Sequence, residues 1–92
     1  MATQQGSQNV RLQDIGWAVK QMHTGSRVRR AGWNGKGMWL ALVAEGAAMI
    51  PQKISDGYDV MAFVAMKTAD NKFVPWLCSQ TDLLAIDWEI AE

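Results

Sequence analysis

The fold is decided by one stretch of the sequence, residues 27–44, which reads RVRRAGWNGKGMWLALVA. Residues 27–30 are expected to form a short strand and residues 32–37 a tight loop, because three glycines there let the backbone turn sharply. Residues 38–44 form a nearly continuous apolar run, which is typical of a strand buried on both faces. The centre of the domain is therefore predicted to be a small β-sheet.

A helix is predicted before this stretch. Its apolar residues Leu12, Ile15, Val19 and Met22 are spaced three or four apart, which is the pattern of one helical stripe. Gly25 follows as the expected stop. Residues 1–10 are polar and aperiodic, so we expect a loose tail followed by a single domain over residues 11–92.

The second half of the chain predicts further strands. Residues 63–68 and 73–77 are expected to pair across a turn at Asp70 and Asn71, both of which tolerate a positive φ. Pro75 lacks an N–H group and places the second of these strands at a sheet edge. The long connection over residues 45–59 has no clear period, and its role is left open.

A short helical segment and a closing strand are expected at the C-terminal end. Ser79 is placed to cap the helical segment, and Asp82 falls where a capping box has its acidic residue. Residues 87–90 alternate like a strand. The predicted fold is α+β, with an N-terminal amphipathic helix packed on a small, mostly antiparallel sheet and a short C-terminal helical turn.

Composition excludes several classes of protein. The chain has 92 residues with nine basic and nine acidic side chains, so a general attraction to DNA or RNA is disfavoured. No apolar run is long enough to span a membrane, and no secretion signal is recognisable. One cysteine, Cys78, and one histidine, His23, provide neither a metal site nor a nucleophilic triad. No cofactor is expected, and binding is favoured over turnover.

Charge is divided unevenly along the chain. Residues 1–36 hold six basic side chains against one acidic side chain, whereas residues 37–92 hold three basic side chains against eight acidic ones. Such a division lets one face attract anions or lets the two halves meet across a subunit contact.

The candidate binding residues combine indoles, arginines and small polar groups. Tryptophan can stack on a nucleotide base, and arginine can hold phosphate oxygens in bidentate fashion. Arg29 and Arg30 are adjacent on a predicted strand, so they point to opposite faces and one of them is the expected phosphate contact. The polar groups near the predicted helix start would read ribose and base edges. The full candidate set is Arg29, Arg30, Trp33, Asn34, Trp76, Ser79, Gln80, Thr81 and Asp82.

Each of these residues also has a purely structural interpretation. Tryptophans in small domains often anchor a core or an interface, and Ser79 with Asp82 can simply cap a helix. The loop at residues 32–37 can be a plain turn that leaves Trp33 exposed.

Several motifs together resemble one known family. They are residues 28–38 (VRRAGWNGKGM), 66–70 (MKTAD), 74–76 (VPW), 79–82 (SQTD) and 87–88 (DW). In this order they resemble a phage-encoded domain family whose studied members are the second type of Thoeris anti-defence protein. The likeness runs over residues 12–91. The chain departs from the family at Asn71 and Lys72, where relatives often have glycine, and at Cys78, where alanine is common.

The resemblance implies a non-enzymatic sponge in the cytoplasm of an infected bacterium. It implies binding of glycocyclic ADP-ribose, a signal made by a bacterial TIR-domain protein, and for some members also of the cyclic dinucleotides of CBASS defence. It further implies a homotetramer with ligand sites between subunits. Two alternatives stay open: an enzyme that degrades the signal, and a structural oligomer module without a ligand.

Overall fold

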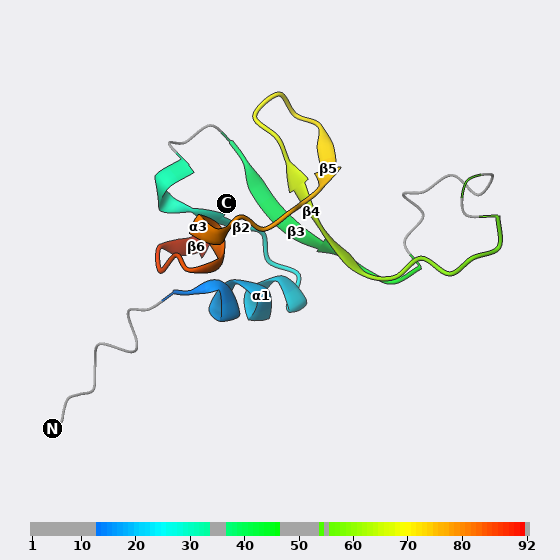
Figure 1. Cartoon of the computed structure of the whole chain (residues 1–92), viewed down its shortest axis with the longest axis horizontal. Helices are drawn as coiled ribbons and strands as arrows, with labels where there is room; N and C mark the ends of the chain where they lie inside the picture. The colour runs from blue at the N-terminus through cyan, green and yellow to red at the C-terminus, as the bar shows by residue number, and fades with distance from the viewer. Residues whose placement is uncertain (1–12, 34–36, 47–53, 55, 92) are drawn as a thin grey trace, which may run out of the picture.

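The computed structural model describes residues 13–33, 37–46, 54 and 56–91. Five strands form one antiparallel sheet in the order β5-β4-β3-β2-β6, which confirms the α+β prediction (Figure 1). The expected N-terminal tail, Leu12 and Asn34 lie outside the described residues. The elements are α1 (Ile15–His23), β2 (Val28–Arg30), the 3-10 helix η2 (Ala31–Trp33), β3 (Trp39–Val43), β4 (Phe63–Lys67), β5 (Phe73–Pro75), α3 (Gln80–Leu83) and β6 (Trp88–Ile90).

Both ends of α1 are defined by local chemistry. The Asp14 carboxylate accepts a hydrogen bond from a first-turn backbone N–H at 2.9 Å, so the helix begins after Asp14. At the other end Gly25 has a φ of 93°, and its N–H donates to the Met22 carbonyl. The next N–H, from Ser26, donates to the Gln21 carbonyl, which completes a Schellman motif. The stop predicted at Gly25 is therefore confirmed.

Replacing Gly25 by alanine is expected to destabilise the domain by about 1–2 kcal/mol. A Cβ there would meet nothing within 4 Å, so the loss comes from the positive φ alone. The free energy of unfolding in urea measures it. Gly16→Ala is the matched control, because Gly16 lies inside α1 without a positive φ and alanine there is expected to stabilise by about 0.5–1 kcal/mol. Equal effects of the two substitutions would contradict this explanation.

The buried side of α1 differs from the predicted stripe by one position. Ala18 is fully buried and Met22 is 3% exposed, whereas Val19 is 39% exposed. Ala18 takes the inner position because its small side chain lets the helix approach the sheet closely, where it packs against Val28 and Leu40. The prediction that Val19 belongs to the buried stripe was therefore wrong.

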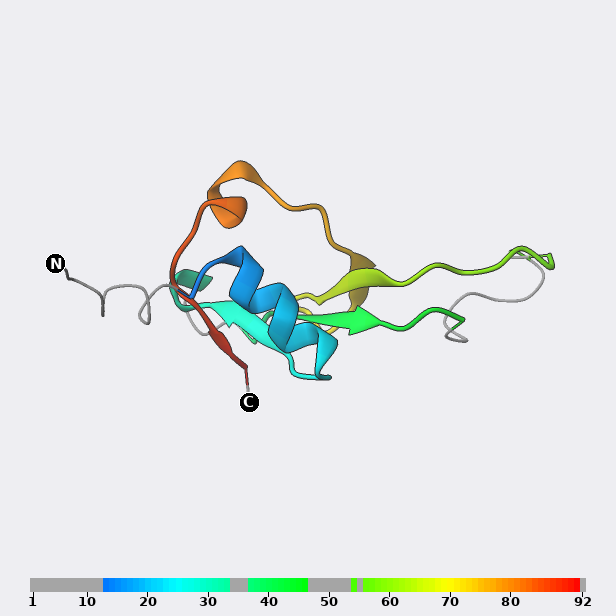
Figure 2. The same cartoon turned by 90° about the horizontal axis from the view of Figure 1, so that it is seen from below.

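The two faces of the sheet are covered unequally. Val28, Leu40 and Trp88 point to the face on which α1 packs, and all three are fully buried. Figure 2 shows α1 lying across one face of the sheet. The strand neighbours of these three residues point to the opposite face, and both described helices lie on the first face. Within β3 only Leu40 is buried and the other residues are half-buried. The prediction that this strand is buried on both faces was wrong, because α1 and α3 both lie on the same face and no helix of the described residues covers the other.

The β4–β5 hairpin follows the prediction closely. Asn71 adopts a φ of 65°, and the Thr68 N–H donates to the Lys72 carbonyl at 2.8 Å. β5 is an edge strand, which accommodates Pro75 without loss of a sheet hydrogen bond. The regular strand ends at Pro75 instead of Leu77, because the chain leaves the sheet there towards α3.

Of the long connection at residues 45–59, the structure describes residues 45, 46, 54 and 56–59. The Gly46 N–H donates to the Val60 carbonyl at 2.9 Å, so the two sides still pair beyond β3 and β4. Its described residues lie away from the helices, towards the right of Figure 1.

Candidate functional site

Three indoles meet on the helix-covered face of the sheet. Trp88 is fully buried at the centre. The Trp33 ring meets it edge to face at a centroid distance of 5.6 Å, and the Trp76 ring does so at 6.0 Å. Trp33 and Trp76 keep part of their surface exposed. We call Trp33, Trp76 and Trp88 the tryptophan cluster.

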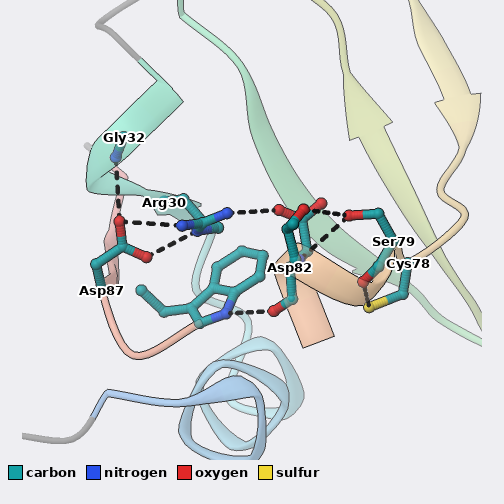
Figure 3. Close-up of polar contacts among 8 residues, drawn as sticks. Arg30, Gly32, Cys78, Ser79, Asp82 and Asp87 are labelled. Atoms are coloured by element: carbon teal, nitrogen blue, oxygen red, sulfur yellow. Dashed lines mark hydrogen bonds and ion pairs between the residues drawn. The ribbon is translucent and has the colours of Figure 1, made fainter. Parts of the chain in front are cut away.

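An ion-pair cluster lies beside these indoles. The Arg30 Nε donates to the Asp87 carboxylate at 2.7 Å, and its Nη1 donates to the Asp82 carboxylate at 2.9 Å (Figure 3). The Gly32 N–H also donates to Asp87, at 3.3 Å. Trp88 joins this network, because its indole N–H donates to the Asp82 backbone carbonyl at 3.2 Å. We call Arg30, Asp82 and Asp87 the Arg30 clamp.

The clamp stabilises the ionised forms of Arg30 and Asp87. The hydrogen bonds from Arg30 lower the pKa of Asp87 below its ordinary value, against the opposing effect of burial. Hydrogen bonds to Asp87 and Asp82 raise the pKa of Arg30. Two carboxylates face one guanidinium, so the clamp carries a formal charge of about −1 when all three groups are ionised.

The lowered pKa of Asp87 predicts a pH dependence of stability. The stabilisation is fully present above the ordinary carboxyl pKa of about 4 and is lost as the pH falls through the folded-state value. Because the Asp87 side chain is 36% exposed, solvent screening limits the effect to about 1 kcal/mol. We expect Asp87→Asn to be less stable than the parent chain at pH 6 and nearly equal to it well below pH 3, in urea unfolding. A difference that persists unchanged in acid would contradict this.

The start of α3 is occupied by its own polar groups. The Ser79 hydroxyl accepts the Asp82 N–H at 3.2 Å and lies 3.0 Å from the Thr81 hydroxyl, which confirms the predicted cap. The capping box is incomplete, because the Asp82 carboxylate accepts from Arg30 instead of returning to Ser79. Gln80 is exposed.

The thiol of Cys78 lies next to this helix start. Its Sγ donates to the Ser79 carbonyl at 3.5 Å. Partial burial raises the pKa of the thiol, and the negative charge of Asp82 adds to the effect. The thiol is therefore protonated near neutral pH and is a weak nucleophile.

The structure brings together most of the predicted site residues. Arg30, Asp82, Ser79 and Thr81 share one network, and Trp33 and Trp76 flank Trp88 beside it. Arg29 does not belong to this group, because it lies on the opposite face and its Nε donates to Glu89 at 2.7 Å. Both arginines proposed to contact phosphate therefore hold carboxylates in this structure.

Two features of the site were missed from the sequence. Trp88 was assigned to a closing strand and to the DW motif but was not a candidate site residue, although it is the centre of the tryptophan cluster. A second aromatic group lies on the open face, where the Arg27 guanidinium stands 4.7 Å above the Trp39 ring and Phe73 meets the same ring edge on. Alternation along the strands could have separated Trp39 from Leu40, but it could not pair residues from different strands.

The described ranges contain neither a candidate metal site nor a candidate membrane-spanning helix. Within residues 13–33, 37–46, 54 and 56–91, no group of three or more His, Cys, Asp or Glu side chains could hold a metal ion. None of the helices described is long and apolar enough to cross a membrane.

Comparison with known proteins gives two matches. The model of the Thoeris anti-defense 2-like domain matches residues 13–91. The protein named Thoeris anti-defense 2 from Bacillus phage SP01 is 39% identical over 81 residues, which cover 83% of this chain and 91% of that relative. The match spans the whole sheet, both described helices, the tryptophan cluster and the Arg30 clamp.

Proposed function

Because the chain belongs to the Thoeris anti-defense 2-like family of phage anti-defence proteins, we propose that it counters bacterial defence as a non-enzymatic sponge. It binds a cyclic nucleotide signal and keeps that signal from its effector. Glycocyclic ADP-ribose is the proposed ligand, and CBASS cyclic dinucleotides are a second class to be tested. The proposed place of action is the cytoplasm of the infected host.

The tryptophan cluster is the observation that carries this proposal. Trp33 and Trp76 expose part of their indoles next to the polar groups of α3. Stacking of a base on an indole contributes about 1–3 kcal/mol. The Ser79 and Thr81 hydroxyls and the Asp82 carboxylate belong to the start of α3, which is linked to the cluster by the hydrogen bond from the Trp88 indole N–H to the Asp82 carbonyl, and they suit ribose hydroxyls. The arrangement therefore fits a small aromatic ligand with several hydroxyl groups.

His23 and Cys78 are the residues best suited to catalysis, and their environments favour storage of the nucleotide over its chemical conversion. His23 ends α1 and is exposed. The Cys78 thiol has a raised pKa, so little thiolate is present at neutral pH. Neither residue is in contact with the tryptophan cluster by any described hydrogen bond or ring contact.

Calorimetry followed by release of the ligand tests this function. Glycocyclic ADP-ribose is titrated into the protein, and a sponge requires nanomolar affinity, about −12 kcal/mol. The complex is then heated until the protein unfolds, and the released nucleotide is identified by mass spectrometry. Intact ligand in stoichiometric amount supports storage. An altered product supports an enzyme, and absence of binding at micromolar concentration overturns the proposal.

Self-association is proposed as part of this function, with a homotetramer as the expected state. Several large apolar side chains around α3 are exposed in the single chain, among them Leu77 at 90% and Leu84 at 74%. Such a surface is typical of a protein contact. Sedimentation equilibrium without and with ligand measures the subunit number. A stable oligomer that binds none of the candidate nucleotides would favour the alternative, a structural module without a ligand.

A further inference from the structure

The Arg30 clamp joins two regions of the chain that are far apart in the sequence, residues 30–32 and residues 82–87. Arg30 ends β2, Asp82 lies in α3, and Asp87 immediately precedes β6. Asp87 also holds η2 through the Gly32 N–H at 3.3 Å, and its carbonyl accepts the Ala31 N–H at 3.0 Å. The guanidinium thus ties α3 and the residue before β6 to the end of β2, in addition to the backbone pairing of β2 with β6.

The same contacts control the tryptophan cluster. Asp82 links the guanidinium to Trp88, because its carboxylate accepts from Arg30 while its carbonyl accepts from the indole N–H (Figure 3). Trp33 follows Gly32 in η2, so the Asp87 contact with Gly32 holds the backbone that carries its indole. Loss of the clamp would let the indoles of Trp33 and Trp88 change their angle to each other.

The guanidinium is already committed to these contacts. Its Nε, Nη1 and Nη2 all donate to carboxylates, and the side chain is only 22% exposed. A phosphate approaching Arg30 would also meet Asp82 and Asp87, whose charges repel it. Direct binding of phosphate by Arg30 is therefore disfavoured.

We propose that Arg30 is a positioning residue of the candidate site: together with Asp82 and Asp87 it sets the geometry of the tryptophan cluster and of α3, without contacting the ligand. The part of this proposal that concerns ligand affinity rests on the function proposed above. The part that concerns the indoles is independent of it.

The chain contains a matched ion pair for comparison. Arg29 and Glu89 join the same two strands at 2.7 Å, but they lie on the opposite face and form no described hydrogen bond with the three indoles of the cluster. Asp87→Asn and Glu89→Gln each neutralise one carboxylate that pairs with β2. If the clamp had a purely structural role, Asp87→Asn and Glu89→Gln would have the same effect on the geometry of the tryptophan cluster.

The first experiment measures near-ultraviolet circular dichroism of Asp87→Asn, Glu89→Gln and Arg30→Lys. Because lysine keeps the positive charge, the Arg30→Lys variant is expected to fold. It cannot reproduce the forked geometry of the guanidinium, so the paired contacts with both carboxylates are lost. We expect Arg30→Lys and Asp87→Asn to lose about half of the tryptophan signal of the folded protein, because that signal depends on ring geometry. Glu89→Gln should leave it unchanged. Equal spectra in all three variants overturn the proposal, whatever their thermal stability.

The second experiment measures affinity for glycocyclic ADP-ribose by calorimetry at two salt concentrations. A positioning role predicts that Arg30→Lys weakens binding about tenfold, equally at about 0.05 M and 0.5 M salt, and that Glu89→Gln binds normally. A loss that is large at low salt and vanishes at high salt would indicate a phosphate contact and overturn the proposal. If the parent chain binds no nucleotide, the proposed function fails, and the circular dichroism still decides the role of Arg30.

Discussion

Trp88→Ala is expected to produce the largest loss of stability of any single substitution in the described core. Trp88 is fully buried, packs against Trp33 and Trp76, and satisfies its indole N–H on Asp82. Removing a buried tryptophan costs about 3–5 kcal/mol. A domain of this size has a total stability of about 5–14 kcal/mol, so the substitution removes a large share of that stability, and all of it at the lower end of the range.

Urea unfolding followed by far-ultraviolet circular dichroism measures this effect. Trp39→Ala is the control, because Trp39 is only half-buried and lies on the open face of the sheet. We expect it to cost about half as much as Trp88→Ala, since less apolar area leaves water on folding. A Trp88→Ala variant within about 1 kcal/mol of the parent chain would show that Trp88 is not the centre of the core.

Loss of both partly exposed indoles is expected to abolish high-affinity binding. Trp33→Leu and Trp76→Leu retain much of the packing volume but remove the aromatic surface. If each indole stacks on the ligand, each substitution weakens binding about tenfold to a hundredfold, and the double variant by about a thousandfold. Calorimetry with glycocyclic ADP-ribose measures the three dissociation constants.

The control for this experiment is a substitution of Trp39, which lies on the open face of the sheet. Trp39→Leu removes an indole that packs with Arg27 and Phe73, away from the tryptophan cluster. Its affinity should equal that of the parent chain. If Trp39→Leu loses affinity while the other two variants keep it, the ligand binds the open face and the site proposed on Trp33 and Trp76 is wrong.

Features with short-range causes could be predicted from the sequence. The end of α1 at Gly25, the hairpin turn at Asn71, the edge position of Pro75 and the cap at Ser79 all depend on residues within about five positions. The resemblance of the motifs to a phage anti-defence family was also readable, and the match over residues 13–91 confirms it.

Features with long-range causes could not be predicted. Ala18, and not Val19, lies on the buried side of α1, because the sheet accepts a small residue there. One face of β3 is not covered by a described helix, because α1 and α3 both lie on the other face. The partners of Arg30 are 52 and 57 residues away in the chain. Spacing within one element carries no information on such contacts.

Local spacing predicted α1, the strands and α3 in their order, because turn, cap and strand preferences act between neighbouring residues, and the motifs predicted the family; η2 was not predicted. The contacts of Trp88 with Trp33 and Trp76, and of Arg30 with Asp82 and Asp87, arise from tertiary packing. The reason is physical: a guanidinium is paired with whichever carboxylates the packed sheet and helices bring within about 3 Å of it, and that distance exists only after folding.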